Sequence, residues 1–348
     1  MRGFRDRDFL QTTEGFFFCV VGALHPPERV ISYIKYVPSE SGVWGKDKKR
    51  FSRILQRYTI PNLLQTFNYL EKNYPHYLFR SPVDNITITA VPHDRIKKHF
   101  KPEQKLAQLS QAPQLDSLQQ KLVRFTRFLA ETAGLSEGIF GVTGSLLLDI
   151  HQSAFSDLDV IVYGMNDSWA LKKALTKNGG SDVTMRRLEG EALEAWGVKK
   201  SQEYPLTAKE AVKLYERKWN LGFFEDRWVS IHPVKLESDV TEVYGEKTYT
   251  PCGQVTIEAL VSDNVDSLFL PATYQIEEVK FLDGRNPLNV TEVITYEGLY
   301  DSLAENGEKI QVKGKLEHVK EKETDRERFR VLVGSPEGKG TEYIKLVE

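Results

Sequence analysis

The stretch 141-GVTGSLLLDIHQSAFSDLDVIVYG-164 decides the fold of this chain. It predicts a strand over 139–143, a helix over 145–152 and a strand over 158–163. The last strand should be buried in a sheet, because its apolar residues follow one another without alternation. A further helix over 168–176 completes an order of strand, helix, strand, helix. We therefore expect the centre of the chain to form a mixed sheet with helices.

Gly144 and Ser145 stand where the first strand turns into the helix. Free backbone N–H groups and the positive end of a helix dipole at such a turn favour an anion. An isolated Gly-Ser pair is equally typical of an ordinary connection, in which Gly makes the turn and Ser caps the helix. The pair alone therefore leaves both interpretations open.

Asp157 and Asp159 flank Leu158 at the start of the buried strand. The two-residue period of a strand places both carboxylates on one face, roughly 6 to 7 Å apart. Like charges so placed repel each other, and a hard cation such as Mg²⁺, which prefers carboxylate oxygens and substrate phosphates, would relieve the repulsion. A solvated strand end is the alternative interpretation.

Taken together, the residues read hydrophobic-Gly-Ser, eleven residues, Asp-hydrophobic-Asp-hydrophobic. This pattern resembles the defining motif of the DNA polymerase β-like nucleotidyltransferase superfamily. The resemblance implies that Gly144 and Ser145 hold the triphosphate of a nucleoside triphosphate and that Asp157 and Asp159 ligate Mg²⁺ or Mn²⁺. It also implies transfer of a nucleoside monophosphate to a hydroxyl of RNA, a protein or a small molecule.

The flanking stretches extend the resemblance over the whole chain. RDRDFLQTTEG (5–15), HPPERVISYIKYVP (25–38) and the β-rich tail look like an archaeal family of predicted nucleotidyltransferases that has no known substrate.

The superfamily usually places a third carboxylate on a later strand, and the best candidate here, WVSIHPV over 228–234, contains no acid. The equivalent position would be Ser230 or His232, which share a face by alternation. His232 is a candidate metal ligand or base, or else a strand-end histidine with a backbone partner. Glu225 and Asp226 could substitute, but the adjacent Arg227 favours a surface turn.

The missing acid permits three interpretations. The chain could use one metal ion, recruit its third acid from elsewhere, or be a catalytically degenerate nucleotide- or RNA-binding protein on the same fold. We favour an active enzyme, because a degenerate site has no chemical reason to keep two repelling carboxylates beside a phosphate-binding turn.

The fold class that we predict is α+β, with three domains. They are a basic α+β domain over 1–110, a nucleotidyltransferase core over 111–240 and a small β-rich domain over 241–348, either an OB-like barrel or a sandwich. The β-rich domain rests on six runs with strand character, at 254–261, 273–281, 291–296, 309–319, 329–333 and 343–347.

Further elements follow from periodicity. The first domain should contain strands at 16–21 and 30–37 and a helical segment at 51–70 that is interrupted or restarted at Pro61. A polar, Gln-rich connector should occupy 103–114. Later helices are expected at 115–133, which Gly134 should end, and at 209–221.

A basic run near the N-terminus suggests a nucleic-acid acceptor, because charge alternates with rings on which bases stack. A solvated helix face is the competing interpretation. About 18 basic and 10 acidic side chains precede residue 111, against about 29 and 39 after it. The run comprises Lys46, Lys48, Lys49, Arg50, Arg53 and Arg57.

Composition excludes several protein classes. The longest apolar runs fall short of the roughly 20 residues that span a bilayer, so we expect a cytoplasmic protein without membrane association. The two cysteines, Cys19 and Cys252, have no partner at disulfide or zinc spacing. The sequence does not indicate the oligomeric state.

Overall fold

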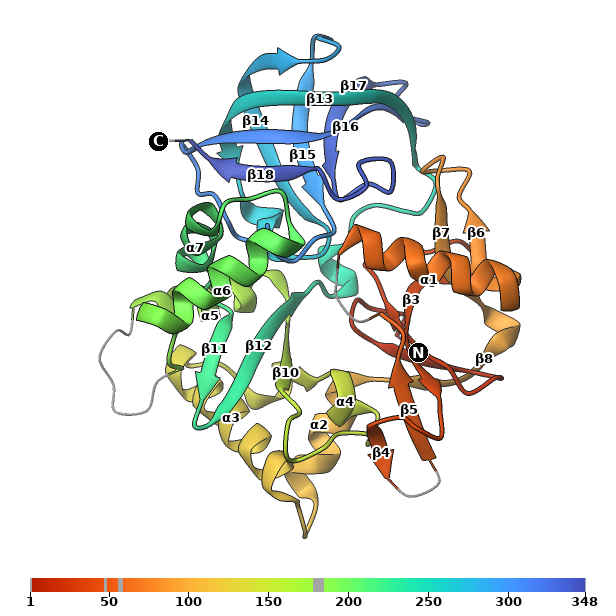
Figure 1. Cartoon of the computed structure of the whole chain (residues 1–348), viewed down its shortest axis with the longest axis vertical. Helices are drawn as coiled ribbons and strands as arrows, with labels where there is room; N and C mark the ends of the chain where they lie inside the picture. Colours follow the sequence, from red (N-terminus) through yellow and green to blue (C-terminus); the bar gives the residue numbers. More distant parts are fainter. Residues whose placement is uncertain (1, 47–48, 56–58, 178–184, 348) are drawn as a thin grey trace. The chain divides into compact units, whose positions relative to one another are not determined.

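The computed structural model describes residues 2–46, 49–55, 59–177 and 185–347, which divide into two compact units (Figure 1). Unit 1 consists of Met1–Leu55, Ala90–Leu188 and Trp219–Thr241. Unit 2 consists of Gln56–Thr89, Glu189–Lys218 and Glu242–Glu348. The structure thus groups segments that are distant in sequence, whereas we predicted three consecutive domains. Both units contain helices and strands, so the α+β class is confirmed.

The first sheet of unit 1 has the strand order β4-β5-β3-β2-β1-β8, and all neighbours are antiparallel. Both strands predicted between 16 and 37 are present, as β2 and β3. The strand bounds are β1 Phe9–Thr12, β2 Phe17–Val20, β3 Arg29–Pro38, β4 Trp44–Lys46, β5 Lys49–Arg53 and β8 Ile96–Phe100.

Strand β7 (Thr87–Pro92) crosses the boundary between the units. Its last residues pair with β3, where Val91 lies opposite Val30. Its first residues pair with β6 (Leu78–Arg80) in unit 2.

One prediction for the first 114 residues was wrong, and another was right only in part. The segment 51–70 is not one helix, because Phe51 pairs with Trp44 and Pro38 in the sheet. Helix α1 (Ile60–Asn73) has Pro61 in its first turn, where the missing N–H costs no hydrogen bond, so the predicted restart of the helix at Pro61 is confirmed. The expected connector at 103–114 is helix α2 (Pro102–Gln111), which starts with a proline and buries apolar residues three positions apart.

The second sheet of unit 1 confirms the strands predicted around the central motif. Its order is β11-β12-β10-β9; β10 and β12 run parallel, and the other pairs are antiparallel. The strand bounds are β9 Phe140–Val142, β10 Leu158–Tyr163, β11 Leu221–Phe224 and β12 Arg227–Val234.

The helices of unit 1 largely follow the sequence prediction. Helix α3 (Ser117–Ala133) is capped by Asp116 and ends at Gly134, whose φ of 65° completes a left-handed cap. Helix α5 (Met165–Lys177) follows β10. The helix predicted over 145–152 is only α4 (Gly144–Leu147), because Asp149 adopts a left-handed backbone with φ 57°.

The first sheet packs against α4 and the loop behind it within one apolar cluster. Phe9, Phe17 and Phe51 belong to the same buried cluster as Leu147 and Leu148. This packing brings β3 and β5 close to the residues that precede β10.

Unit 2 contains the strands predicted after residue 240. Strand β13 pairs with both β14 and β16, and the pairings continue from β14 through β15 and β17 to β16. Strand β18 pairs with β16 outside this ring. The bounds are β13 Lys247–Asp263, β14 Ala272–Asp283, β15 Val290–Thr295, β16 Lys309–Glu321, β17 Glu327–Val333 and β18 Tyr343–Leu346.

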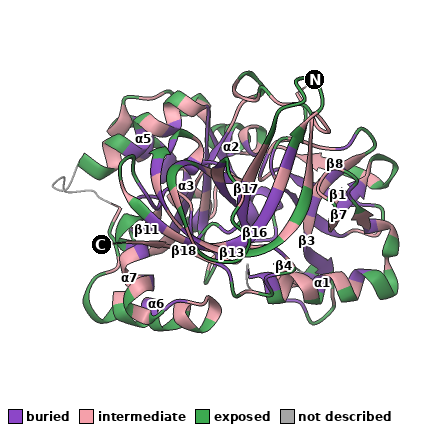
Figure 2. Cartoon of the chain, turned by 90° about the horizontal axis from the view of Figure 1, so that it is seen from above, coloured by how far each residue is buried: buried purple, intermediate pink, exposed green. Residues whose placement is uncertain are grey.

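Helices α6 (Gly190–Glu203) and α7 (Ala208–Arg217) also belong to unit 2. Leu214 of α7 joins Ile257, Tyr274 and Val331 in the core of this unit. In Figure 2 strand β16 is drawn as buried over much of its length, whereas α6 is largely exposed. Within the described ranges, no helix is long and apolar enough to cross a membrane.

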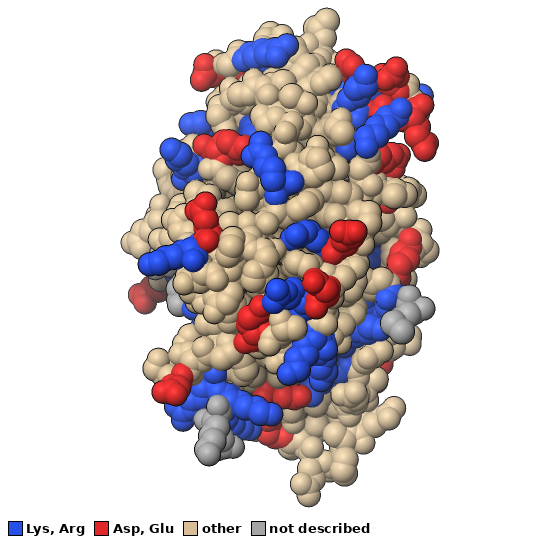
Figure 3. All heavy atoms as spheres, turned by 90° about the vertical axis from the view of Figure 1, so that its right-hand side faces the viewer, with Lys and Arg blue, Asp and Glu red and all other residues tan. Residues whose placement is uncertain are grey.

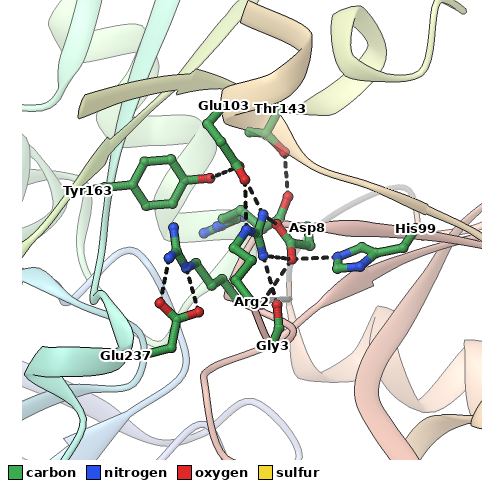
Figure 4. A network of polar contacts seen from close by, with 10 residues as sticks. Arg2, Gly3, Asp8, His99, Glu103, Thr143, Tyr163 and Glu237 are labelled. Atoms are coloured by element: carbon green, nitrogen blue, oxygen red, sulfur yellow. Dashed lines mark hydrogen bonds and ion pairs between the residues drawn. The ribbon is translucent and has the colours of Figure 1, made fainter. Parts of the chain in front are cut away.

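A buried carboxylate near the N-terminus joins several elements of unit 1 (Figure 4). Asp8 is fully buried and accepts hydrogen bonds from two guanidinium nitrogens of Arg2, at 2.6 and 2.8 Å. His99 of β8 lies 2.7 Å from the same carboxylate. Arg2 also bonds Glu103 of α2, and Glu103 accepts from Tyr163 of β10. The network therefore links the two sheets of unit 1.

We predict that Asp8→Ala lowers the free energy of unfolding by roughly 3 kcal/mol, because the largely buried Arg2 guanidinium loses one of its two carboxylate partners and His99 loses the same one. Chemical denaturation measures the change. The matched control is Arg124→Ala, which breaks an exposed ion pair with Glu225 and should cost less than about 1 kcal/mol. Equal losses in the two variants would contradict the importance of the buried network.

Candidate functional site

The Gly144 backbone lies directly against the carboxylate of Asp159. A Cβ added to Gly144 would lie 2.4 Å from Asp159 Oδ2, closer than real Cβ contacts allow. The φ of Gly144 is 68°, a left-handed conformation that favours glycine. The turn predicted from sequence therefore needs glycine for two independent reasons, its left-handed backbone and its close approach to the acidic strand.

Asp159 is held from the other side by strand β12. The parallel register of β10 and β12 places Ser230 opposite Asp159, and Ser230 Oγ donates to Asp159 Oδ1 at 2.5 Å. His232 Nε2 lies 2.9 Å from Ser230 Oγ and 3.9 Å from Asp159 Oδ1. Because the Ser230 hydroxyl donates its only hydrogen to the Asp159 carboxylate, its oxygen accepts the hydrogen bond from His232 Nε2. The two positions that we proposed for a third acid thus form a hydrogen-bonded chain that ends on Asp159.

The two carboxylates of the motif have opposite pKa shifts. Removal from water and the negative charge of Asp159 raise the pKa of Asp157 to about 6, although the residue keeps contact with solvent. Burial alone would raise the pKa of Asp159 too, but the nearby His232, the positive charge of Lys35 and the Ser230 hydrogen bond hold it well below its usual range. Asp159 is therefore the firmly ionised member of the pair.

Lys35 is a site residue that our sequence analysis missed. Strand β3 has an irregular register against β2 here, because Phe17 pairs with Tyr36 while Phe18 pairs with Ile34. Such a bulge re-aims side chains and is frequent beside active sites. The Lys35 side chain is buried, and its ammonium lies 5.4 Å from the centre of the Phe9 ring. The lone Lys within the apolar run of β3 was the signal that could have revealed it.

Two arginines add to the positive charge near Asp157. Arg53 of β5 and Arg227 of β12 both act on Asp157 electrostatically, as Lys35 does. Arg227 also donates to the carbonyl of Ala154 at 2.8 Å, three residues before Asp157. The acidic pair is thus surrounded by cations from both sheets of unit 1.

The loop between α4 and β10 is fixed by polar contacts. Ser156 Oγ accepts from the backbone N of Gln152 at 2.9 Å, and Ser145 Oγ lies 3.4 Å from Ser156 Oγ. The buried His151 lies 2.7 Å from the Asp116 carboxylate. These contacts fix the position of Ser145 relative to the residue that precedes Asp157.

The structure brings together the central residues of the motif and separates some of the others. Five residues lie around the N-terminal end of β10, namely Gly144, Ser145, Asp157, Asp159 and His232. Among the basic residues, Arg53 lies near Asp157, and Lys49 and Arg50 belong to the β4–β5 hairpin instead of a helix face. Lys48 and Arg57 lie outside the described residues.

The neighbouring acids do not supply a third ligand. Glu225 pairs with Arg124, and Asp226 pairs with Lys121 on the surface. The prediction of a surface turn at these residues is therefore confirmed.

The donor chemistry fits a hard cation with few protein ligands. In the described part of the chain, no three His, Cys, Asp or Glu side chains gather closely enough to hold a metal ion. Mg²⁺ is commonly bound through one or two carboxylates together with substrate phosphates and water. Asp157 and Asp159 therefore suit Mg²⁺ that arrives with a phosphate-bearing substrate.

Comparison with known proteins gives a relative along the whole chain. The "Uncharacterized protein MJ1086" of Methanocaldococcus jannaschii is 28% identical over 344 residues, which cover 98% of each chain. No family model matches the sequence. No solved structure matches the chain either.

We predict that Gly144→Ala reduces both stability and metal binding, because its methyl group displaces the Asp159 carboxylate. Gly134→Ala is a matched control, since Gly134 has a similar φ of 65° but nothing within 4 Å of an added Cβ. The control should lose only the cost of left-handed backbone, roughly 1 to 2 kcal/mol. Denaturation and Mn²⁺ titration compare the variants, and equal effects at both glycines would rule out the proposed contact.

We further predict that Asp157→Asn stabilises the metal-free protein at pH 7. The folded protein keeps the Asp157 proton up to about pH 6, whereas the ordinary pKa is 3.8, so stability falls as pH rises through this window. The gain should be about 1 kcal/mol, after allowance for solvent contact, and should vanish below about pH 4.

Chemical denaturation in EDTA at several pH values measures this gain. In the control Asp226→Asn, the lost acid has its pKa lowered by Lys121, so no gain is expected. An Asp157→Asn variant without a gain at pH 7 would contradict the repulsion between the two carboxylates.

Proposed function

We propose that this chain transfers a nucleoside monophosphate from a nucleoside triphosphate to an acceptor hydroxyl, with Mg²⁺ or Mn²⁺ held by Asp157 and Asp159. The observation that carries the proposal is the contact between the Gly144 turn and the Asp159 carboxylate. A backbone that can bind phosphate and a carboxylate that can bind metal then meet at one point, as the reacting end of a triphosphate requires.

The reaction is an in-line displacement. The acceptor oxygen forms a bond to the α-phosphorus, the bond from this phosphorus to the bridging β-oxygen breaks, and pyrophosphate leaves while the hydroxyl proton passes to solvent. Bound Mg²⁺ would neutralise phosphate charge and lower the pKa of the attacking hydroxyl.

Residues of both sheets would position the triphosphate and the metal ion. Gly144 and Ser145 would hold the triphosphate, and Lys35 and Arg53 would neutralise charge that develops on the leaving pyrophosphate. Ser230 and His232 orient Asp159 through the hydrogen-bonded chain, a supporting role that partners of ligating carboxylates commonly have. This arrangement assigns a role to the strand that has no third acid.

One observation favours a second candidate function. Because Ser230 and His232 stand where the superfamily usually has an acid, the site could bind nucleotides or RNA without transfer chemistry. Strand pairing in unit 2 is compatible with both candidate functions. The strands form a ring β13-β14-β15-β17-β16 with β15 and β17 parallel, which is the strand order of a small OB-like barrel. Barrels of this kind commonly bind oligonucleotides. We propose that these strands close into such a barrel.

Incubation with each radiolabelled nucleoside triphosphate, Mg²⁺ or Mn²⁺ and total cellular RNA tests the proposal. We expect label transfer by the native protein, and a loss of at least about a hundredfold in Asp157→Asn and Asp159→Asn, which remove the metal-binding charge. Ser230→Ala should lose roughly 10- to 100-fold in activity or metal affinity.

Glu225→Gln is the control, because its surface acid lies outside the site. Transfer that persists unchanged in both aspartate variants would refute the proposed site. Nucleotide binding without any transfer by the native protein would favour the second candidate function.

A further inference from the structure

The β4–β5 hairpin docks on the loop that leads to Asp157. Gly45 N donates to the carbonyl of Ile150 at 2.7 Å, and Gln152 Nε2 donates to the carbonyl of Gly45 at 2.5 Å. The rings of Trp44 and Phe155 meet edge to face with centroids 5.1 Å apart. The hairpin and the loop therefore form one surface within unit 1.

Phe155 is an exposed aromatic side chain on this otherwise well-anchored loop. Its exposed fraction is 49%, although the residue lies only two positions before Asp157. Trp44 supports one edge of the ring, and Arg227 fixes the preceding carbonyl, that of Ala154. A rigidly held exposed ring is suited to stacking with a planar ligand group.

The hairpin face beside Phe155 carries positive charge. Strand alternation puts Trp44 and Lys46 on one face, and the register places Lys49 opposite Lys46 and Phe51 opposite Trp44. Arg53, two residues beyond Phe51, continues this face toward Asp157, whereas Arg50 alternates to the other face. Lys46 and Lys49 are both exposed.

Like charges directly opposite each other destabilise a strand pair. A bound phosphate group would offset the repulsion between Lys46 and Lys49. Figure 3 shows clusters of Lys and Arg side chains toward the lower end of one face of the molecule, among fewer acidic ones.

We propose that Lys46, Lys49 and Phe155 form a binding surface for a single-stranded polynucleotide, whose phosphates contact the two lysines and one of whose bases stacks on Phe155. The inference rests on the proposed function, and it makes the acceptor a nucleic acid that approaches Asp157 along the hairpin face past Arg53. Phosphate charge and base stacking are the two contributions that such strands offer to a protein.

The test is fluorescence anisotropy of a labelled single-stranded oligonucleotide, as RNA and as DNA of the same sequence, in EDTA. Phe155→Leu keeps the apolar contact with Trp44 but removes the flat ring, and should weaken binding roughly 5- to 100-fold. Phe155→Trp should restore it. Lys46→Ala with Lys49→Ala should lower the slope of log Kd against log salt by roughly 1.4, whereas Phe155→Leu should leave the slope unchanged.

The matched control is Lys97→Ala with Lys98→Ala, two exposed lysines of β8 at the opposite edge of the same sheet. It should bind as the native protein does. The proposal would be overturned if the control weakened oligonucleotide binding as much as the Lys46 and Lys49 variant does, or if Phe155→Leu bound as tightly as the native protein. It would also be overturned if polyglutamate competed as well as an unlabelled oligonucleotide of the same sequence does. The binding assay contains no metal and no nucleoside triphosphate. Tight binding that depends on Phe155 and on the two lysines as described therefore supports this surface even if label transfer fails.

Discussion

The close approach of the Gly144 backbone to the Asp159 carboxylate is the constraint on which the site depends. Without a side chain at Gly144, the turn after β9 can lie against β10 while the chain reverses with a positive φ. The loop behind α4 is held in turn by His151 and Ser156, which bond Asp116 and the backbone of Gln152. The turn and the acidic strand thus become one structure.

Charge balance around β10 explains the positions of several residues that are distant in sequence. Two neighbouring carboxylates repel, and the structure offsets the repulsion with Lys35, Arg53 and Arg227 from separate strands. The register of β3 against β2 is irregular at Lys35, a buried lysine whose positive charge acts on both acids.

Strand β12 replaces an expected acid with a hydrogen-bonded chain. In the superfamily that the motif resembles, a third carboxylate would share the metal ions. Here Ser230 engages Asp159 and His232 engages Ser230. This hydrogen-bonded chain keeps Asp159 ionised and fixes the orientation of its carboxylate. Strand β12 therefore acts on the site through Asp159 and contributes no carboxylate of its own.

The sequence by itself determined the strands around the motif, the end of α3 at Gly134 and the absence of an acid on β12, because periodicity, glycine chemistry and composition are local. Local patterns misjudged the segment at 51–70 and the helix at 102–111, where cross-strand pairing and a proline helix start decided the outcome. Only the tertiary structure decided that Lys35 and Arg53 lie near Asp157, that Trp44 packs against Phe155 and that the units combine distant segments. Sheet register and packing, which bring such residues together, leave no periodic signal in the chain.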